Sequence, residues 1–338
     1  MMSGGMPSPT RIFQIGCAFR ASKVLLSAIE LDVFTVLSEQ PLDIAALIRR
    51  VGIQERGARD FFDTLVALEI LRRSDDGLYT NGSEADFYLD RRKPTYVGSL
   101  FEQYSAIGYG LWNSLTQALR TGAPQVGEAP EDHFADTYGD PVRMLTFVKS
   151  MTAGSLLAAK AIAAQFPWQD YQTVIDVGTA EGCLPVEVAL AHPHIRGGGF
   201  DLPQLRDAFN TYIEEHGLTG RLQFYPGNFF ETALPAADVI VFGRILHNWD
   251  LETRRTLLSK GYDAVRDGGA VIVYETLIPE DRRSSTAGML ASLNMLLWTV
   301  GGSDFTGAQC AEWMQEAGFR EIRIEPLTTE ESMVIAKK

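Results

Sequence analysis

Cysteine, histidine and positive charge are scarce in this sequence. Its 338 residues include three cysteines and five histidines, and 30 Lys and Arg residues stand against 43 Asp and Glu residues, which gives a net charge of −13. Cys17, Cys183 and Cys310 are too far apart for a CxxC metal motif or a disulfide framework, and they fit a reducing compartment. A surface this acidic repels phosphate backbones, so nucleic acid is not the expected partner.

Long apolar runs and a leader segment are also missing. The longest apolar stretch, Gly288 to Val300, contains polar residues and is too short to cross a bilayer, so no membrane partner is expected. The first residues, MMSGGMPSPTRIF, lack a basic segment followed by an apolar one, so we expect no signal peptide. With 46% hydrophobic and 22% charged residues, the chain is expected to be a folded, cytoplasmic protein of two domains.

The first part of the chain is predicted to be helical and to end in a hairpin. Apolar residues recur at helical spacing between Ile12 and Leu37, with a break near Asp32. Further helices are predicted from Ile44 to Arg50 and from Phe61 to Leu71. The Asp-Gly step at 76–77, between short apolar runs, then predicts a hairpin. Helices followed by a hairpin are typical of a winged-helix domain.

A winged helix often binds DNA, but charge argues against that here. Its second helix carries Asp60, Asp63 and Glu69 against Arg59, which is a poor face for a major groove. We therefore expect this domain to serve dimerisation, so that the protein is a homodimer. A non-catalytic, ligand-sensing winged-helix protein is the alternative from another functional class.

The second part of the chain alternates between strands and helices. Residues 98 to 165 are predicted to be helical, with a polar loop from Thr121 to Pro141. After Tyr171, short β-rich runs are separated mostly by helices, which predicts an α/β fold with a doubly wound, mainly parallel sheet. The predicted strands are Thr173–Val177, Gly197–Phe200, Leu222–Tyr225, Val239–Phe242, Ala270–Tyr274, Ile322–Ile324 and Met333–Ala336. The expected domains are 1–97, a helical connector at 98–168 that contributes to the substrate pocket, and 169–338.

The first strand of this sheet ends in a loop of small residues, Asp-Val-Gly-Thr-Ala-Glu-Gly at 176–182. Gly178, Ala180 and Gly182 let a cofactor approach the backbone at the edge where doubly wound sheets bind ligands. Asp201 ends the next strand, 23 residues after Gly178, and could accept hydrogen bonds from ribose hydroxyls.

The same loop does not fit a dinucleotide. The G-x-G-x-x-G pattern fails at Ala180 and at Cys183. Asp176 and Glu181 make the loop acidic, which suits a cofactor that carries a cation, such as the sulfonium and ammonium groups of S-adenosylmethionine. The sequence therefore favours that cofactor over NAD.

Further motifs follow in a fixed order along the chain. They are Phe147, Met151 and Ser155 at spacings of four, Asp176–Gly182, Phe200–Pro203 (FDLP), Gly227–Phe230 (GNFF), Arg244–Trp249 (RILHNW) and Tyr274–Pro279 (YETLIP). In this order the chain resembles the small-molecule, S-adenosylmethionine-dependent O-methyltransferases typified by caffeic acid and acetylserotonin O-methyltransferases, with many bacterial natural-product enzymes among them. The resemblance covers nearly the whole chain. It implies a Rossmann-like class I methyltransferase domain preceded by a winged-helix dimerisation domain.

The resemblance also implies a role for each matching residue. His247 would be the general base, and Glu275 and Asp304 would orient its imidazole, Asp304 standing where the family usually has Glu. The implied cofactor-binding residues are Ser155, Gly178, Gly182, Asp201, Leu202, Asn228, Phe229 and Arg244. The implied acceptor-pocket residues are Met151, Met295 and Thr299. No metal is expected, because no second histidine or carboxylate lies close enough to His247 in the sequence to argue for a metal site.

These residue types suit methyl transfer to a phenol. A phenol has a pKa near 10, so a base that takes its proton makes it a better nucleophile, and the pKa of histidine suits that task. Asn228 and Asn248 stand where the family usually has Asp. These changes leave the methylated atom open: oxygen of a small, aromatic molecule is expected, and carbon or nitrogen is the alternative.

Overall fold

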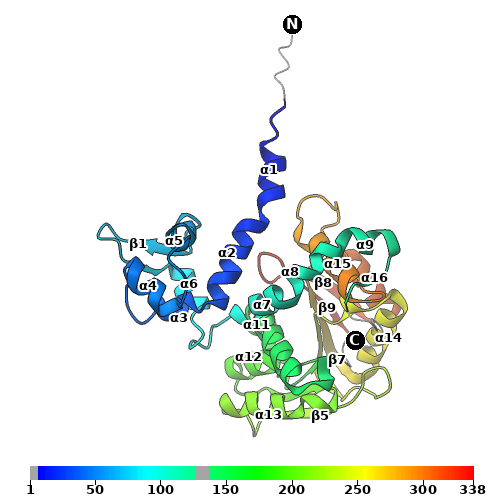
Figure 1. Ribbon diagram of the computed structural model, residues 1–338. Coiled ribbons are helices and arrows are strands. Elements are labelled where there is room, and N and C mark those ends of the chain that lie inside the picture. The colour runs from blue at the N-terminus through cyan, green and yellow to red at the C-terminus, as the bar shows by residue number, and fades with distance from the viewer. Residues whose placement is uncertain (1–6, 127–136) are drawn as a thin grey trace. The chain divides into compact units, whose positions relative to one another are not determined.

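The computed structural model describes residues 7–126 and 137–338 (Figure 1). The chain forms two compact units, Met1–Tyr109 and Gly110–Lys338. Domain boundaries after residues 97 and 168 stay predictions. Residues 127–136 of the expected loop between Thr121 and Pro141 lie outside the described residues.

The first unit is a helical domain with a short hairpin, as expected from the sequence. The helix predicted from Phe61 to Leu71 instead ends at Ala67, and Leu71 begins the first strand of the hairpin. Asp32, with a φ of 59°, separates the second and third helices at the predicted break, and Gly77, with a φ of 84°, lies in the turn of the hairpin. The elements are α1 (Thr10–Cys17), α2 (Phe19–Glu30), α3 (Val33–Leu37), α4 (Ile44–Val51), α5 (Ala58–Ala67), β1 (Leu71–Arg73), β2 (Tyr79–Asn81), α6 (Ser83–Tyr88) and α7 (Gly98–Gln103), followed by a π-helical turn at Tyr104–Gly108.

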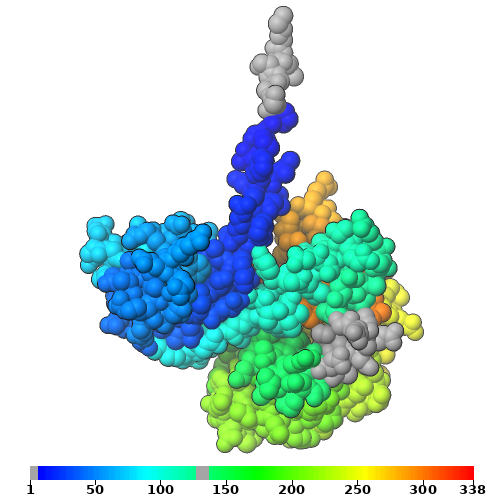
Figure 2. All heavy atoms as spheres, in the orientation of Figure 1, coloured from blue at the N-terminus to red at the C-terminus, as the bar shows by residue number. Residues whose placement is uncertain are grey.

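Helix α1 contributes no buried side chain to the core of this unit. Ile12, Phe13 and Ile15 are 75%, 65% and 64% exposed, and Figure 2 draws the atoms of this helix in dark blue. Taken together as one helical run, α1 and α2 (Thr10–Glu30) form the one segment in the described part of the chain that is long and apolar enough to cross a membrane, by length and composition only. Residues 288–300, the longest apolar stretch of the sequence, fall mostly in a shorter helix at Ala287–Trp298.

The second unit contains all seven predicted strands. Its elements are α9 (Leu115–Thr121), α11 (Pro141–Gln165), β3 (Thr173–Val177), α12 (Cys183–Ala191), β4 (Arg196–Asp201), α13 (Arg206–Glu215), β5 (Leu222–Pro226), β6 (Ala237–Gly243), α14 (Leu251–Ala264), β7 (Val265–Glu275), α15 (Ala287–Trp298), α16 (Gly307–Glu316), β8 (Arg320–Pro326) and β9 (Ser332–Lys337), and the short α8 (Tyr109–Leu111) begins at the boundary between the units.

These strands form one sheet in the order β5-β4-β3-β6-β7-β9-β8. The first five strands in this order are mutually parallel, and β9 runs antiparallel to β7 and β8. Alternate residues face opposite layers: Val174 packs in the cluster with α11 and α12, whereas Ile175 and Val177 pack in the cluster with α14 and α16. Because β3 to β7 run parallel to one another, their carboxyl ends lie at the same edge of the sheet, where doubly wound sheets bind ligands.

Candidate active site

The loop after β3 is a tight bend fixed to the end of β4. Gly178, Ala180 and Gly182 all have positive φ, at 74°, 52° and 96°. The backbone N–H of Ala180 donates to Asp201 Oδ2 at 2.9 Å, and that of Leu202 donates to Oδ1 at 2.8 Å. Each carboxylate oxygen has a further lone pair, so Asp201 can still accept hydrogen bonds from a ligand.

Three carboxyl groups around this bend are buried: those of Asp176, Glu181 and Asp201. Burial raises the pKa of Asp176 to about 7 and that of Asp201 to about 6, and it also raises the pKa of Glu181. Since each raised pKa reflects the cost of a buried negative charge, a bound cation would lower that cost. The expected preference for a cationic ligand therefore has a physical basis here.

The residues after β5 form a local turn beside aromatic rings. Asn228 Oδ1 accepts a hydrogen bond from the backbone N–H of Phe230 at 3.0 Å. The ring of Phe229 lies 5.9 Å from that of Trp249, edge to face, and the Phe229 carbonyl accepts from Lys260 Nζ. This turn follows β5 at the carboxyl edge of the sheet, but the expected contact of Asn228 and Phe229 with an adenine stays a prediction.

The chain leaves β6 through Arg244, which has a φ of 55°. Its backbone N–H donates to the Tyr274 carbonyl at 3.0 Å, so the end of β6 is fixed to β7. The buried Tyr274 phenol in turn interacts with the Ser155 side chain of α11. Arg244 and Ser155, both expected to contact a cofactor, are thus connected through Tyr274.

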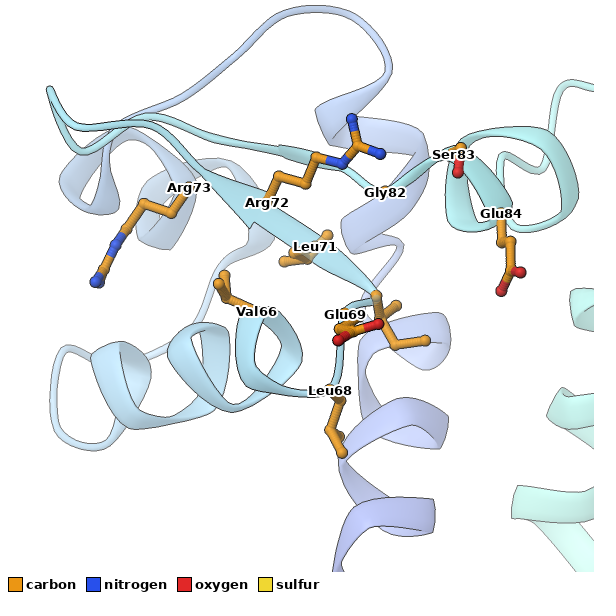
Figure 3. A pocket seen from close by; sticks show the side chains of 10 residues that line it. Val66, Leu68, Glu69, Leu71, Arg72, Arg73, Gly82, Ser83 and Glu84 are labelled. Atoms are coloured by element: carbon orange, nitrogen blue, oxygen red, sulfur yellow. The ribbon is translucent and has the colours of Figure 1, made fainter.

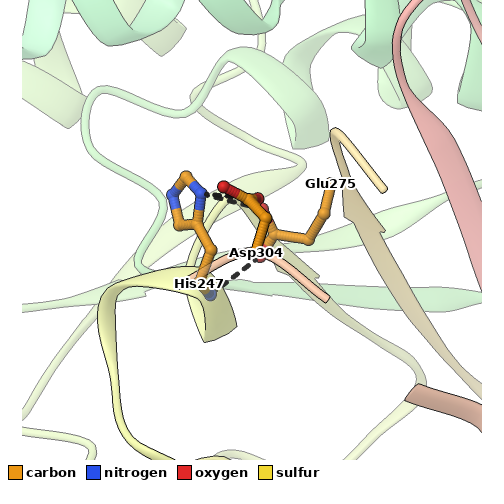
Figure 4. A group of neighbouring side chains, drawn as sticks. All are labelled: His247, Glu275 and Asp304. Atoms are coloured by element: carbon orange, nitrogen blue, oxygen red, sulfur yellow. Dashed lines mark hydrogen bonds and ion pairs between the residues drawn. The ribbon is translucent and has the colours of Figure 1, made fainter. Parts of the chain in front are cut away.

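His247, Glu275 and Asp304 come together although they lie far apart in the sequence (Figure 4). His247 Nδ1 lies 3.3 Å from Asp304 Oδ1 and 3.5 Å from Glu275 Oε2. The other ring nitrogen points away from both carboxylates in Figure 4. Two carboxyl groups therefore face one nitrogen of the imidazole. A proton on Nδ1 could be donated to them, and in that tautomer Nε2 is the nitrogen that can accept a proton.

Charge and burial oppose each other in this cluster. Burial lowers the pKa of His247, but the carboxylates of Glu275 and Asp304 outweigh it, so the pKa lies above its ordinary value of 6.5. Burial raises the pKa of Glu275 to about 7, with Asp304 adding to the shift and His247 opposing it. The cluster therefore changes its proton content close to neutral pH.

The backbone around His247 is held from several sides. Its N–H donates to Glu275 Oε1 at 3.3 Å, and its carbonyl accepts from the Ser303 N–H at 2.8 Å. Asn248 Nδ2 donates to the carbonyl oxygens of Arg244 and Ile245 at 3.1 and 3.3 Å. The amide at position 248 therefore closes the turn that carries His247, which an Asp could not do, because a carboxylate cannot donate.

The three expected acceptor-pocket residues lie on α11 and at the end of α15. Met295 is buried, and its carbonyl accepts from the Thr299 hydroxyl at 2.9 Å. That hydroxyl also accepts from the Gly302 N–H at 2.9 Å. Thr299 thus has a local role in the loop after α15, and a contact of Met151, Met295 or Thr299 with an acceptor stays a prediction.

A surface recess of about 680 Å³ lies elsewhere, in the first unit (Figure 3). It is open and is lined by Leu68 and Glu69 of the connection between α5 and β1, by Arg72 of β1 and by Glu84 of α6, among others. It contains none of the residues expected to act chemically, and its lining mixes both charges. The sheet edge, rather than this recess, is the candidate active site.

Sequence reasoning missed one buried charge near the site, Arg254 of α14, which is 4% exposed. Its sequence neighbour Arg255 is exposed and pairs with Glu316, and nothing in the sequence distinguishes the two. The fold brings ligand-type atoms of His247, Glu275 and Asp304 within 4.8 Å of one another, a grouping that sequence spacing did not predict. The expectation that no metal binds here stays a prediction.

Comparison with known proteins identifies this architecture. Residues 112–320 match an O-methyltransferase domain, and residues 13–91 match an O-methyltransferase dimerisation domain. The chain is 39% identical to the tetracenomycin polyketide synthesis 8-O-methyl transferase TcmO of Streptomyces glaucescens, over 98% of this chain and 97% of the relative. It is 34% identical to the N,N-dimethyltransferase OxyT of Streptomyces rimosus, over 91% and 90%.

Solved structures agree with these matches. Human N-acetylserotonin methyltransferase, crystallised with S-adenosylmethionine, superimposes with a TM-score of 0.90 at 27% identity, covering 100% of this chain and 99% of that one. The chain belongs to the O-methyltransferase family and is an S-adenosylmethionine-dependent methyltransferase.

Proposed function

We propose that this enzyme methylates a hydroxyl group of a small aromatic molecule and that His247 is its general base. The observation that carries the proposal is the contact of Glu275 and Asp304 with Nδ1 of His247, which leaves Nε2 as a proton acceptor. The similarity to TcmO, whose name describes O-methylation in polyketide synthesis, supports an oxygen as the acceptor atom.

The residues at the sheet edge fit the cofactor. Asp201 has lone pairs free for two ribose hydroxyls, and the bend from Gly178 to Gly182 would hold the methionine part. Leu202, Asn228 and Phe229 would surround the adenosine, and Ser155 and Arg244 would complete the pocket. When bound, S-adenosylmethionine supplies a methyl group activated by the positive sulfonium. The buried carboxyls of Asp176 and Asp201 favour that charge.

His247 would remove the proton of the acceptor hydroxyl. Its Nε2 takes the proton, while Asp304 and Glu275 stabilise the imidazolium that forms. General-base catalysis of this kind typically increases the rate by roughly 10²–10⁴-fold. The phenolate that results is the stronger nucleophile. In this proposal Met151, Met295 and Thr299 line the acceptor pocket and hold the hydroxyl in line with the methyl group.

The test is methyl transfer to a panel of mono- and polycyclic phenols by the wild type, His247→Ala and His216→Ala. We expect His247→Ala to lose roughly 10²–10⁴ in kcat with unchanged cofactor affinity. The control should be as active as the wild type, because the His216 ring contacts the Tyr212 carbonyl of its own helix, α13. Equal rates for His247→Ala and the wild type would refute the assigned base. Chelation by EDTA is expected to leave the rates unchanged.

Nitrogen is a second candidate acceptor, because the chain is 34% identical to an enzyme named as an N,N-dimethyltransferase. A neutral amine already has its lone pair and does not require a base. An aminated panel beside the phenol panel separates the two readings: turnover of amines that is indifferent to His247→Ala would favour nitrogen.

The exposed apolar face of α1 supports a homodimer. Ile12, Phe13 and Ile15 are among the most exposed large apolar residues of the described chain. Phe13 and Ile15 lie at the start of the segment that matches a dimerisation domain, and Ile12 directly precedes it. We propose that a second copy of this chain covers them. The three free cysteines, two of them buried, support a reducing, cytoplasmic location.

A further inference from the structure

A buried guanidinium connects the two loops that carry His247 and Asp304. Arg254 of α14 is 4% exposed. Its Nε donates to the carbonyl oxygen of Leu246 at 3.0 Å. Its Nη2 donates to the Ser303 carbonyl and, at 3.0 Å, to Ser303 Oγ. Leu246 and Ser303 directly precede His247 and Asp304, so each hydrogen bond fixes the peptide that leads into one member of the cluster.

The surroundings of this guanidinium hold it in one position. Its central carbon lies 5.0 Å from the ring centroid of Phe305 and 5.4 Å from that of Trp313, and these two rings contact each other edge to face. Cation–π contacts strengthen when water is excluded. The planar fork of an arginine can serve two carbonyl oxygens at once, whereas the single ammonium group of a lysine has no such fixed geometry.

The charge of Arg254 also matters to the cluster. Burial lowers its pKa, and the carboxylates of Glu275, Asp304 and Asp250 oppose that shift. A buried cation is costly unless opposite charge lies nearby, and here two of those carboxylates contact His247. The other charged groups that act on this site are Arg244 after β6 and Glu331 before β9.

We propose that Arg254 is a positioning residue that fixes His247 against Asp304 and balances the negative charge of the cluster. This inference rests on the proposed role of His247. Arg254 contacts neither acceptor nor cofactor in this proposal. It acts through the peptides of Leu246 and Ser303 and through the field of its charge on Glu275 and Asp304.

The test compares Arg254→Met and Arg254→Lys with the matched control Arg255→Met, which removes the neighbouring exposed ion pair to Glu316. Two experiments are made on each variant. Steady-state kinetics give kcat and the KM values for the acceptor and for S-adenosylmethionine, and NMR follows the titration of the His247 imidazole in protein without cofactor. The His247 signal is identified by its loss in His247→Ala. The NMR readout does not depend on activity.

For Arg254→Met we expect kcat to fall by roughly 10–10²-fold, with the cofactor KM within about twofold of the wild type. The His247 titration should move up by about one pH unit, because removing a buried cation favours protonation. Arg254→Lys keeps the positive charge and loses the planar guanidinium. In this variant the His247 imidazole should titrate near the wild-type value, while kcat should still fall. Arg255→Met should change neither quantity.

Wild-type kcat and an unmoved titration in Arg254→Met would overturn the inference, as would equal upward shifts in the Met and Lys variants. If Arg254→Met does not fold, Arg254→Lys decides, because wild-type kcat in that variant excludes a positioning role for the fork. A wild-type rate in His247→Ala would instead refute the proposed base. The NMR titration would then still report on the link between Arg254 and the imidazole.

Discussion

His247 Nδ1 lies 3.3 Å from Asp304 Oδ1, across 57 residues of chain. The resemblance to the family implies the longer Glu at this position, and Asp304 still reaches the imidazole because of where its loop lies. The Asp304 N–H donates to Ser292 Oγ at 3.2 Å, and the preceding residue, Ser303, donates to the His247 carbonyl. These two hydrogen bonds bring a shorter side chain to the same nitrogen.

The first prediction concerns the pH dependence of catalysis. A general base must be unprotonated, and Glu275 and Asp304 hold the pKa of His247 above 6.5 against the effect of burial. We therefore expect kcat/KM for a phenol to rise with pH through a value above 6.5 and then to level off. In His247→Gln this limb should disappear together with most of the activity. A profile with its midpoint below 6 in the wild type would contradict the assignment.

Asp304→Asn should shift the pH profile of kcat/KM to lower pH, opposite in direction to the upward shift of the His247 titration expected in Arg254→Met. Removing a carboxylate beside Nδ1 lowers the pKa of His247, so the acidic limb should shift to lower pH. We expect kcat to fall by roughly 10–10²-fold, less than in hydrolase triads, because Glu275 still contacts the same nitrogen. Asp304→Glu serves as the matched control and should keep the limb in place. Steady-state kinetics from pH 5 to pH 9 measure both.

Cofactor affinity should also depend on pH. Burial raises the pKa of Asp176 from 3.8 to about 7, and a cation bound nearby favours the ionised form. S-adenosylmethionine should therefore bind more tightly as pH rises through about 7. The affinity of S-adenosylhomocysteine, which lacks the sulfonium charge, should increase much less over the same range. Calorimetry at pH 5.5 and pH 8 tests this. Asp176→Asn should reduce this difference in affinity, leaving the part that comes from Asp201, whose pKa burial raises to about 6. Asp207→Asn, which changes an exposed α13 residue, should leave the difference unchanged.

The same raised pKa fixes the sign of a stability change. Between about pH 4 and about pH 7 the folded protein keeps a proton on Asp176 that the unfolded chain has lost. For the cofactor-free protein, this group contributes stability that is present at low pH and lost as pH rises through about 7. Thermal unfolding of the wild type and Asp176→Asn across this range checks the sign.

Asn248→Asp should impair the enzyme although it restores the residue usual in the family. The Asn248 amide donates to the carbonyls of Arg244 and Ile245, and a carboxylate there would face two carbonyl oxygens with no proton to donate. We expect a lower kcat and, because a negative charge is added near His247, an acidic limb at higher pH. Asn248→Ala, which removes the donor without adding charge, separates the two effects. Activity above the wild type in Asn248→Asp would contradict this account.

The final prediction concerns assembly. If a second copy covers α1, Ile12→Glu combined with Phe13→Glu should convert the dimer to a monomer, because charged side chains would be buried in an apolar interface. Gln14→Glu, on the same helix, is the control and should leave the dimer intact. Light scattering coupled to gel filtration measures the mass. A wild-type protein that is monomeric at micromolar concentration, or that binds neutral lipid vesicles through this helix, would refute the proposed partner.

Much of the fold could be read from the sequence because its determinants are local. The seven strands follow from β-rich runs separated by helices, and the break at Asp32 and the turn at Gly77 follow from the backbone preferences of short stretches. The loop at 176–182 was recognisable because its small residues and acidic neighbours are contiguous. The sequence also placed His247 and Glu275 shortly after two predicted strands, Val239–Phe242 and Ala270–Tyr274. These strands correspond to β6 and β7, which are neighbours in the sheet.

Only the tertiary structure decided which distant groups share one environment. It placed Asp304 on the imidazole, directed the Asn248 amide back to two carbonyls, and buried Arg254 between aromatic rings while leaving Arg255 in solvent. Contacts of this kind join residues separated by tens of positions, and their energies depend on burial, which no short window of sequence records. The amino-acid order thus determined the helices and strands and the chemical groups that they carry. Packing determined which of those groups contact one another and how burial and neighbouring charges shift their pKa values.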